Sequence, residues 1–335
     1  MGTTNRSSVV CGSLIVGGFH GHALTASFEK ALATGERGGA ILFRRNIPSS
    51  FDELRTLTKS IREVAKISAI VGVDQEGGRV ARIGKPAMVI PPARELASQD
   101  PEAIFRLAEA QGRELASLGF TINFAPVLDI DSCATNPVIG DRSFGKAADD
   151  VVRSAIPFAL GLQNGGVAAC AKHFPGHGDT TRDSHFDLPV VDAAREQLQS
   201  REWLPFKAAA AAGVRSMMTA HVVYPAVDTL PATLSHRFCT EILRDFIGFR
   251  GALFSDDLEM KALADRYSIE DSATLAIEAG CDALLVCSDE EMQSRAHEAL
   301  CRRYESNARF RERCDEASMR IEHFLRSNNI SAHST

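Results

Sequence analysis

Short apolar runs recur along the chain, and most are followed by a stretch with the spacing of an amphipathic helix. The runs are nearly continuous in hydrophobic residues and lack an alternating polar face, which is typical of parallel strands buried on both sides. Eight such strands, alternating with helices, predict an α/β protein formed by a single (β/α)8 barrel of the TIM type. The expected strands span residues 12–18, 39–43, 69–73, 121–128, 167–172, 216–221, 252–255 and 283–287.

Helix-capping signals fall between these strands. Asp100 and Pro101 precede an apolar-periodic stretch that Gly119 ends, just before the fourth strand. Ser268 and Asp271 have the spacing of a capping box at the start of another helix. These signals support the alternation of strands and helices.

The length of the chain, 335 residues, lies in the range of single-domain α/β barrels. No linker or low-complexity tract interrupts the alternation, so we expect residues 1–335 to form one domain, with a frayed polar tail over residues 327–335. A long alanine-rich helix is expected over residues 192–212. The first apolar run contains glycines and lacks a small-residue cleavage site, so we expect a core strand there and not a secretory signal.

Composition and charge exclude several classes of protein. Hydrophobic residues make up 44% and charged residues 24%, as in ordinary globular proteins. A net charge of -6 with mixed signs predicts no nucleic-acid partner, and the lack of an 18-residue apolar run predicts no membrane span. The eight cysteines form no C-x-x-C pair and several lie in apolar runs, so we expect reduced thiols in the cytoplasm.

One stretch, from Lys172 to His185 (KHFPGHGDTTRDSH), concentrates titratable side chains directly after a predicted buried strand. It contains three histidines, two aspartates, a lysine and an arginine. In a barrel, the active site lies at the carboxyl ends of the strands and in the loops that follow them. We therefore expect this stretch to line a catalytic pocket.

Polar residues also follow other expected strands. Asp74 and Arg82 lie in DQEGGRVAR, Arg142 lies in IGDRSFG, and Asp256 lies in FSDDLEM. Because the carboxyl ends of barrel strands face the same side, these residues should share one pocket with the stretch from Lys172. Basic side chains donate several hydrogen bonds and aspartates accept them, which suits a polyhydroxylated or acidic ligand.

Three further residues at strand ends have competing interpretations. We expect Glu76 to hold its own loop through backbone amides, and Asp129 to be structural. His221 is either a residue of the pocket or a buried histidine of the core.

Together the four motifs resemble the signature of family 3 glycoside hydrolases, in the branch of β-N-acetylglucosaminidases. They occur in the same order over residues 10–290. The resemblance implies a retaining β-N-acetylhexosaminidase that removes terminal N-acetylglucosamine from peptidoglycan fragments containing 1,6-anhydro-N-acetylmuramic acid. It implies a cytoplasmic enzyme of peptidoglycan recycling, a single catalytic domain, and no cofactor or metal. We further expect a monomer without nucleic-acid or membrane partners.

The resemblance also implies a role for each matching residue. Asp256 would be the nucleophile, and His185 would be the general acid/base, polarised by Asp183. The residues that would bind the N-acetylglucosamine unit are Asp74, Arg82, Arg142, Lys172 and His173.

A histidine in place of the usual second carboxylate leaves other functions open. With an ordinary pKa of about 6.5, it can protonate the leaving oxygen and then deprotonate water. A neutral imidazole does not repel an anion, so phosphate could replace water, which makes a β-N-acetylglucosaminide phosphorylase the main alternative. A metal-dependent hydrolase, with His173, His177, Asp183 and His185 as ligands, and a non-catalytic sugar-binding barrel are the remaining alternatives.

Overall fold

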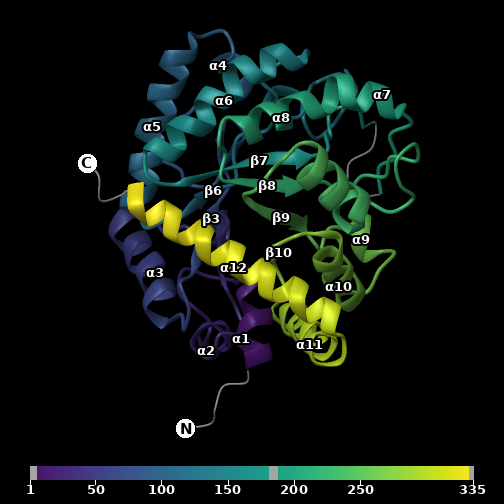
Figure 1. Ribbon diagram of the computed structural model, residues 1–335. Coiled ribbons are helices and arrows are strands. Elements are labelled where there is room, and N and C mark those ends of the chain that lie inside the picture. Colours follow the sequence, from purple (N-terminus) through teal and green to yellow (C-terminus); the bar gives the residue numbers. More distant parts are fainter. Residues whose placement is uncertain (1–5, 181–187, 332–335) are drawn as a thin grey trace.

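In the computed structural model, which describes residues 6–180 and 188–331, eight parallel strands close into a barrel (Figure 1). Around the barrel they follow their order along the chain, so the predicted (β/α)8 architecture is confirmed. The strands are β1 (Ile15–Gly17), β2 (Gly39–Leu42), β3 (Ile70–Val73), β6 (Ile122–Asn123), β7 (Ala168–Phe174), β8 (Ser216–Thr219), β9 (Ala252–Asp257) and β10 (Ala283–Val286).

Helices surround the barrel and bury a large apolar layer against it. None of the helices in the described ranges is long and apolar enough to cross a membrane. The longer ones are α2 (Ala26–Thr34), α3 (Phe51–Val64), α5 (Pro101–Ser117), α6 (Ala148–Asn164), α8 (Trp203–Ala211), the π-helix η5 (Arg237–Phe246), α10 (Ile269–Ala279) and α11 (Glu290–Ser306). The short ones are α4 (Ala93–Leu96), α7 (Arg195–Gln197) and α9 (Lys261–Ala264).

The predicted helix caps are confirmed. The Asp100 side chain accepts a hydrogen bond from the backbone N–H of Glu102, and Ser268 accepts one from that of Asp271. The expected helix over residues 192–212 begins later, at Arg195, and contains a π-helical turn, η3 (Leu198–Glu202), between α7 and α8.

The boundaries of two expected strands are wrong. Residues 12–18 do not form one strand, because α1 (Arg6–Ser13) occupies the first part and packs against α11 and α12 (Ala308–Ser331). Within 121–128 only β6 is regular, because Pro126 has no N–H with which to continue the ladder. Beyond it, Val127 pairs with Lys172 through an isolated bridge.

The barrel interior is filled by side chains and closed at one end by α12. Phe324 of α12 packs edge-on against Phe254 of β9, with ring centroids 5.9 Å apart, and Ile321 and Leu325 join the same cluster. In Figure 1, α12 (yellow) crosses the barrel opening. The helix α12 extends to Ser331, and residues 332–335 of the expected polar tail lie outside the described residues.

A buried cluster of charges fastens α12 to the same end of the barrel. Asp282, just before β10, has no exposed surface and accepts from Arg244 at 2.7 Å, Arg313 at 2.6 Å and Arg320 at 3.4 Å. It also accepts from the backbone N–H of Leu253 at 3.0 Å. Since α12 blocks the amino ends of the strands, only their carboxyl ends remain for a site.

Candidate active site

The polar residues predicted to share a pocket meet where β3 and β7 end. Asp74 directly follows β3, and the hairpin of β4 (Gln75–Gly77) and β5 (Val80–Ala81) turns the chain back so that Arg82 reaches Asp74. The Arg82 guanidinium donates to one oxygen of Asp74 at 3.2 Å, and the Lys172 ammonium donates to the other at 2.8 Å. The structure thus brings together three of the residues predicted to bind sugar.

Lys172 is almost completely buried and is held between two carboxylates. Its Nζ lies 2.8 Å from Asp74 Oδ1 and 2.7 Å from Glu76 Oε1. Burial alone would lower the pKa of Lys172, but the charges of Asp74 and Glu76 outweigh it and raise the pKa. Lys172 therefore presents a fixed positive charge at neutral pH.

Glu76 has a role that the sequence analysis missed. Its carboxylate accepts two hydrogen bonds from Arg142, at 2.9 Å to Nε and 2.7 Å to Nη2, besides the contact with Lys172. The expectation that it holds its loop through backbone amides is wrong. Burial would raise the pKa of Glu76, yet the two cations lower it well below its usual range. This carboxylate orients Arg142, and the only available signal in the sequence was its position two residues after Asp74.

His173 is oriented by Asp129, which has the structural role expected of it. The buried Asp129 carboxylate lies 2.7 Å from His173 Nδ1 and accepts from the backbone N–H of His177 at 2.6 Å. Burial would raise the pKa of Asp129, but the two histidines lower it overall. Because a carboxylate only accepts, Nδ1 of His173 carries the proton, and the ring orientation is fixed.

Asp256, near the end of β9, is an ionised carboxylate. Burial raises its pKa, but His221, His173 and Lys172, together with a hydrogen bond from the backbone N–H of Asp257 at 2.8 Å, lower it below its ordinary value. A carboxylate that attacks carbon must be deprotonated, so this environment suits a nucleophile.

Asp257 has the opposite environment, although it is the next residue. Its carboxylate accepts from the backbone N–H groups of Glu259 at 3.1 Å and Cys287 at 3.2 Å. Burial and the charges of Glu259 and Asp256 raise the pKa of Asp257 to about 7. Asp256 is therefore the ionised group, whereas Asp257 joins β9 to the end of β10.

His221 combines features of both interpretations. It is 1% exposed, its Nδ1 lies 2.8 Å from the Thr233 hydroxyl, and its Nε2 lies 2.9 Å from the carbonyl oxygen of Asp257. A carbonyl only accepts, so Nε2 carries a proton. The ring is a hydrogen-bonded buried histidine, yet it also helps to keep Asp256 ionised.

The loop after β7 is held down along the part that the structure describes. Asn136 donates to the carbonyl oxygens of His177 and Gly178 at 2.9 and 3.0 Å, and Asp179 pairs with Arg201 at 2.8 Å. Burial lowers the pKa of His177 to about 4, so that its ring is neutral. The predicted acid/base pair, His185 and Asp183, lies outside the described residues.

The described part of the chain contains no group of three or more His, Cys, Asp and Glu side chains arranged to hold a metal ion. Of the four residues weighed as metal ligands, His173 has its Nδ1 on Asp129 and His177 has its Nδ1 2.9 Å from the Thr180 hydroxyl. The other two lie in the undescribed segment 181–187.

Sequence comparison matches residues 13–323 to the family model described as the N-terminal domain of glycosyl hydrolase family 3. A β-hexosaminidase of Alkalilimnicola ehrlichii is 40% identical over 281 residues, which cover 82% of this chain and 80% of that protein. A β-hexosaminidase of Neisseria gonorrhoeae is 39% identical over 275 residues, covering 79% of this chain and 75% of that protein.

Comparison with solved structures finds proteins of the same kind. A family 3 β-N-acetylglucosaminidase from a Paenibacillus species superposes with a TM-score of 0.93 at 38% identity, over 98% of this chain but only 64% of that longer one. NagZ from Neisseria gonorrhoeae, solved in complex with N-trifluoroacetyl-D-glucosamine, superposes with a TM-score of 0.78 at 32% identity, covering 95% of this chain and 96% of that one.

Proposed function

The chain belongs to glycosyl hydrolase family 3, and on that premise we propose that it is a retaining β-N-acetylglucosaminidase of peptidoglycan recycling. It is an enzyme of the β-hexosaminidase type. The substrate in this proposal is a peptidoglycan fragment in which β-linked N-acetylglucosamine precedes 1,6-anhydro-N-acetylmuramic acid, with or without its peptide. A single catalytic domain, a monomeric state and a cytoplasmic location belong to the same proposal.

One observation carries the proposal: an ionised Asp256 lies in the electrostatic field of a fixed group of sugar-binding candidates. Lys172 is one of the charges that lower the pKa of Asp256, and Lys172 is itself bound to Asp74. Asp74 and Arg82 offer acceptors and donors suited to sugar hydroxyl groups. This arrangement supports a nucleophile placed beside a sugar subsite.

In the first step, the Asp256 carboxylate attacks the anomeric carbon and forms a covalent glycosyl-enzyme. His185, as an imidazolium stabilised by Asp183, donates its proton to the leaving glycosidic oxygen and becomes a neutral imidazole. In the second step, His185 takes a proton from water, and the hydroxide displaces Asp256 from the same carbon. Two inversions at this carbon give net retention.

The remaining predicted residues would hold the N-acetylglucosamine unit during both steps. Arg142 is fixed by Glu76, and His173 is fixed by Asp129, so both present their donors without a large loss of side-chain entropy. Asp74 would accept hydrogen bonds from ring hydroxyls with the lone pairs that Arg82 and Lys172 leave available.

The proposal is tested by cleavage of p-nitrophenyl β-N-acetylglucosaminide by the wild type and by Asp256→Ala, with Asp257→Asn as matched control. We expect Asp256→Ala to lower kcat by about 1,000-fold or more, as for other lost nucleophiles. Asp257→Asn keeps an oxygen that accepts from the backbone N–H of Cys287. We expect its kcat to fall by less than about tenfold, because the protonated carboxyl group of Asp257 already resembles an amide. Equal losses in both variants would contradict the nucleophile assignment.

The same assay with phosphate decides between the hydrolase and the phosphorylase. Hydrolysis predicts N-acetylglucosamine as product at every phosphate concentration. N-acetylglucosamine 1-phosphate as the main product would establish the phosphorylase instead. Loss of activity on removal of metal by a chelator would favour the metal-dependent alternative.

A further inference from the structure

A cluster of three cysteines and a histidine lies at the end of the barrel away from the sugar site. Cys11 comes from α1, Cys301 from α11 and Cys314 from α12, so the cluster joins three helices that are distant in sequence. The Cys11 thiol interacts with the thiols of both Cys301 and Cys314. Cys11 and Cys314 have no exposed surface, whereas Cys301 is partly exposed.

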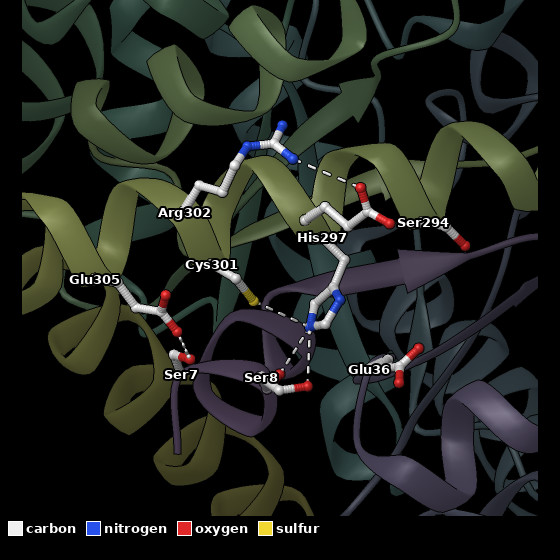
Figure 2. Close-up of a pocket in the computed structure, with 9 residues that line it drawn as sticks. Ser7, Ser8, Glu36, Ser294, His297, Cys301, Arg302 and Glu305 are labelled. Carbon is white, nitrogen blue, oxygen red and sulfur yellow. Dashed lines mark hydrogen bonds and ion pairs between the residues drawn. The ribbon is translucent and has the colours of Figure 1, made fainter. Parts of the chain in front are cut away.

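Cys301 opens into a surface pocket of about 470 Å3 between α1 and α11. Figure 2 shows His297 and Cys301 on α11, with Ser8 of α1 opposite them. The charged side chains in the lining are Glu36, Glu298, Arg302 and Glu305. A neutral oxidant can enter such a pocket, whereas an anionic one would meet three carboxylates against one guanidinium.

The Cys301 sulfur shares the Nε2–H donor of His297 with Ser8. Its Nε2 lies 2.9 Å from the carbonyl oxygen of Ser8, which only accepts, so this nitrogen carries a proton. The Cys301 sulfur lies 3.5 Å from the same nitrogen, one helical turn along α11. A thiolate accepts from this donor better than a thiol does, so the geometry favours ionisation of Cys301.

The two interacting thiols thus differ in character. The contact with Cys11, together with the neighbouring His297, outweighs burial and lowers the pKa of Cys301 to about 5. Contacts with Cys301 and Cys314, together with burial, raise the pKa of Cys11 far above its ordinary value. The pair therefore resembles a thiolate that faces the pocket and a buried thiol that donates to it, as in peroxide-reactive dithiols.

We propose that Cys301 and Cys11 form a reversible peroxide-oxidation site that cross-links α11 to α1. The Cys301 thiolate attacks hydrogen peroxide, the O–O bond breaks, and Cys301 sulfenic acid and hydroxide are formed. The Cys11 sulfur then attacks the Cys301 sulfur, an S–S bond forms, the S–O bond breaks, and the oxygen leaves as water with the Cys11 proton. Two thiols are oxidised by two electrons, and one peroxide is reduced to two waters.

The test uses the full-length reduced protein, treated with hydrogen peroxide, blocked with N-ethylmaleimide and digested without reductant for mass spectrometry. We expect a Cys11–Cys301 disulfide peptide that reductant converts back to two thiols. It should be absent in Cys301→Ser. Cys133→Ser is the matched control, since Cys133 is the other partly exposed cysteine and its sulfur contacts only the Thr135 hydroxyl among the described contacts.

A rate measurement on the wild type keeps the proposal testable if a variant misfolds. Iodoacetamide should alkylate Cys301 roughly tenfold faster than Cys133 at neutral pH, and His297→Gln should reduce this difference. Equal alkylation rates, a cross-link between other cysteines, or Cys301 sulfinic acid beside a free Cys11 would overturn the proposal. Since Cys301 is remote from the sugar site, Cys301→Ser should retain normal glycosidase activity.

Discussion

At the scale of single residues, the charged side chains of the candidate site are fixed by pairs between distant parts of the chain. Glu76 links the side chains of Arg142 and Lys172, and Asp129 joins the His173 ring to the backbone N–H of His177. Each link removes the freedom of a long or titratable side chain before any ligand arrives. The candidate site is therefore positioned by carboxylates that need not touch the substrate.

Replacement of Glu76 by glutamine tests this view. Arg142 and Lys172 would lose a shared counter-charge in a buried place, so we expect kcat/KM to fall about 10- to 100-fold and stability to fall by about 3 kcal/mol. Asp141→Asn, which breaks the more exposed pair with Arg79, is the matched control. It should change kcat/KM and stability only slightly. An unchanged kcat/KM in Glu76→Gln would refute the positioning role.

Glu202 gives a pH-dependent prediction. It is 2% exposed and lies under the loop at Gly176, and burial raises its pKa from 4.5 to about 7 in spite of Arg201. The folded state then binds more protons than the unfolded state between these values, so stability present below pH 4.5 is lost as the pH rises through about 7. Glu202→Gln keeps the neutral form and should escape this loss.

We therefore expect Glu202→Gln to gain stability relative to the wild type as the pH rises from 4.5 to 8, by on the order of 2 kcal/mol. Thermal unfolding at several pH values measures this difference, and the exposed Glu53→Gln serves as control. A difference that stays constant with pH would show that Glu202 does not titrate in this range.

At the scale of elements, the sequence predicts the repeated strands and the helix caps, but it does not predict elements whose form depends on tertiary packing. The alternation of apolar runs gives all eight barrel strands, and the caps at Asp100 and Ser268 are correct. The helix α1 was missed because an apolar run of a few residues has no readable period, and only its packing against α11 decides its form. Likewise, the partners of Glu76 cannot be read from its neighbours in sequence.

The loop after β7 depends on close backbone packing at Gly178. A Cβ added there would lie 1.6 Å from the carbonyl oxygen of Ile130, so any side chain must displace the loop. We expect Gly178→Ala to lower kcat by about tenfold or more, because the loop carries His177 and leads to the predicted acid/base. Gly84→Ala, where a Cβ meets no atom within 4 Å, is the control. Normal turnover in Gly178→Ala would mean that this packing is dispensable.

At the scale of the whole molecule, the two ends of the barrel have different tasks. The carboxyl ends of the strands carry the sugar-binding candidates and Asp256, while α12 and the Asp282 cluster close the amino ends. Stability and chemistry should therefore respond to different substitutions. The fold could be predicted from the sequence because the eight strands and their helices alternate along the chain. The ion cluster could not, because it joins residues that only the folded chain brings together.

Asp282→Asn tests this division. It leaves Arg244 and its neighbours without a buried counter-charge, and we expect a loss of about 3 kcal/mol of stability. Activity measured well below the unfolding temperature should remain near the wild-type value. Glu322→Gln, which breaks the exposed pair with Arg326 on α12, should cost less than about 0.5 kcal/mol. A large loss of turnover in folded Asp282→Asn would contradict the separation of the two ends.

The central claim is that Asp256 attacks the sugar and forms a covalent intermediate. The most direct measurement is peptide mapping after incubation with a fluorinated β-N-acetylglucosaminyl fluoride, which slows release of the glycosyl-enzyme. The anomeric fluoride leaves, and we predict a single fluorinated N-acetylglucosaminyl label on the peptide that carries Asp256, and none in Asp256→Ala. A label on another residue, or inactivation without any covalent label, would contradict the mechanism.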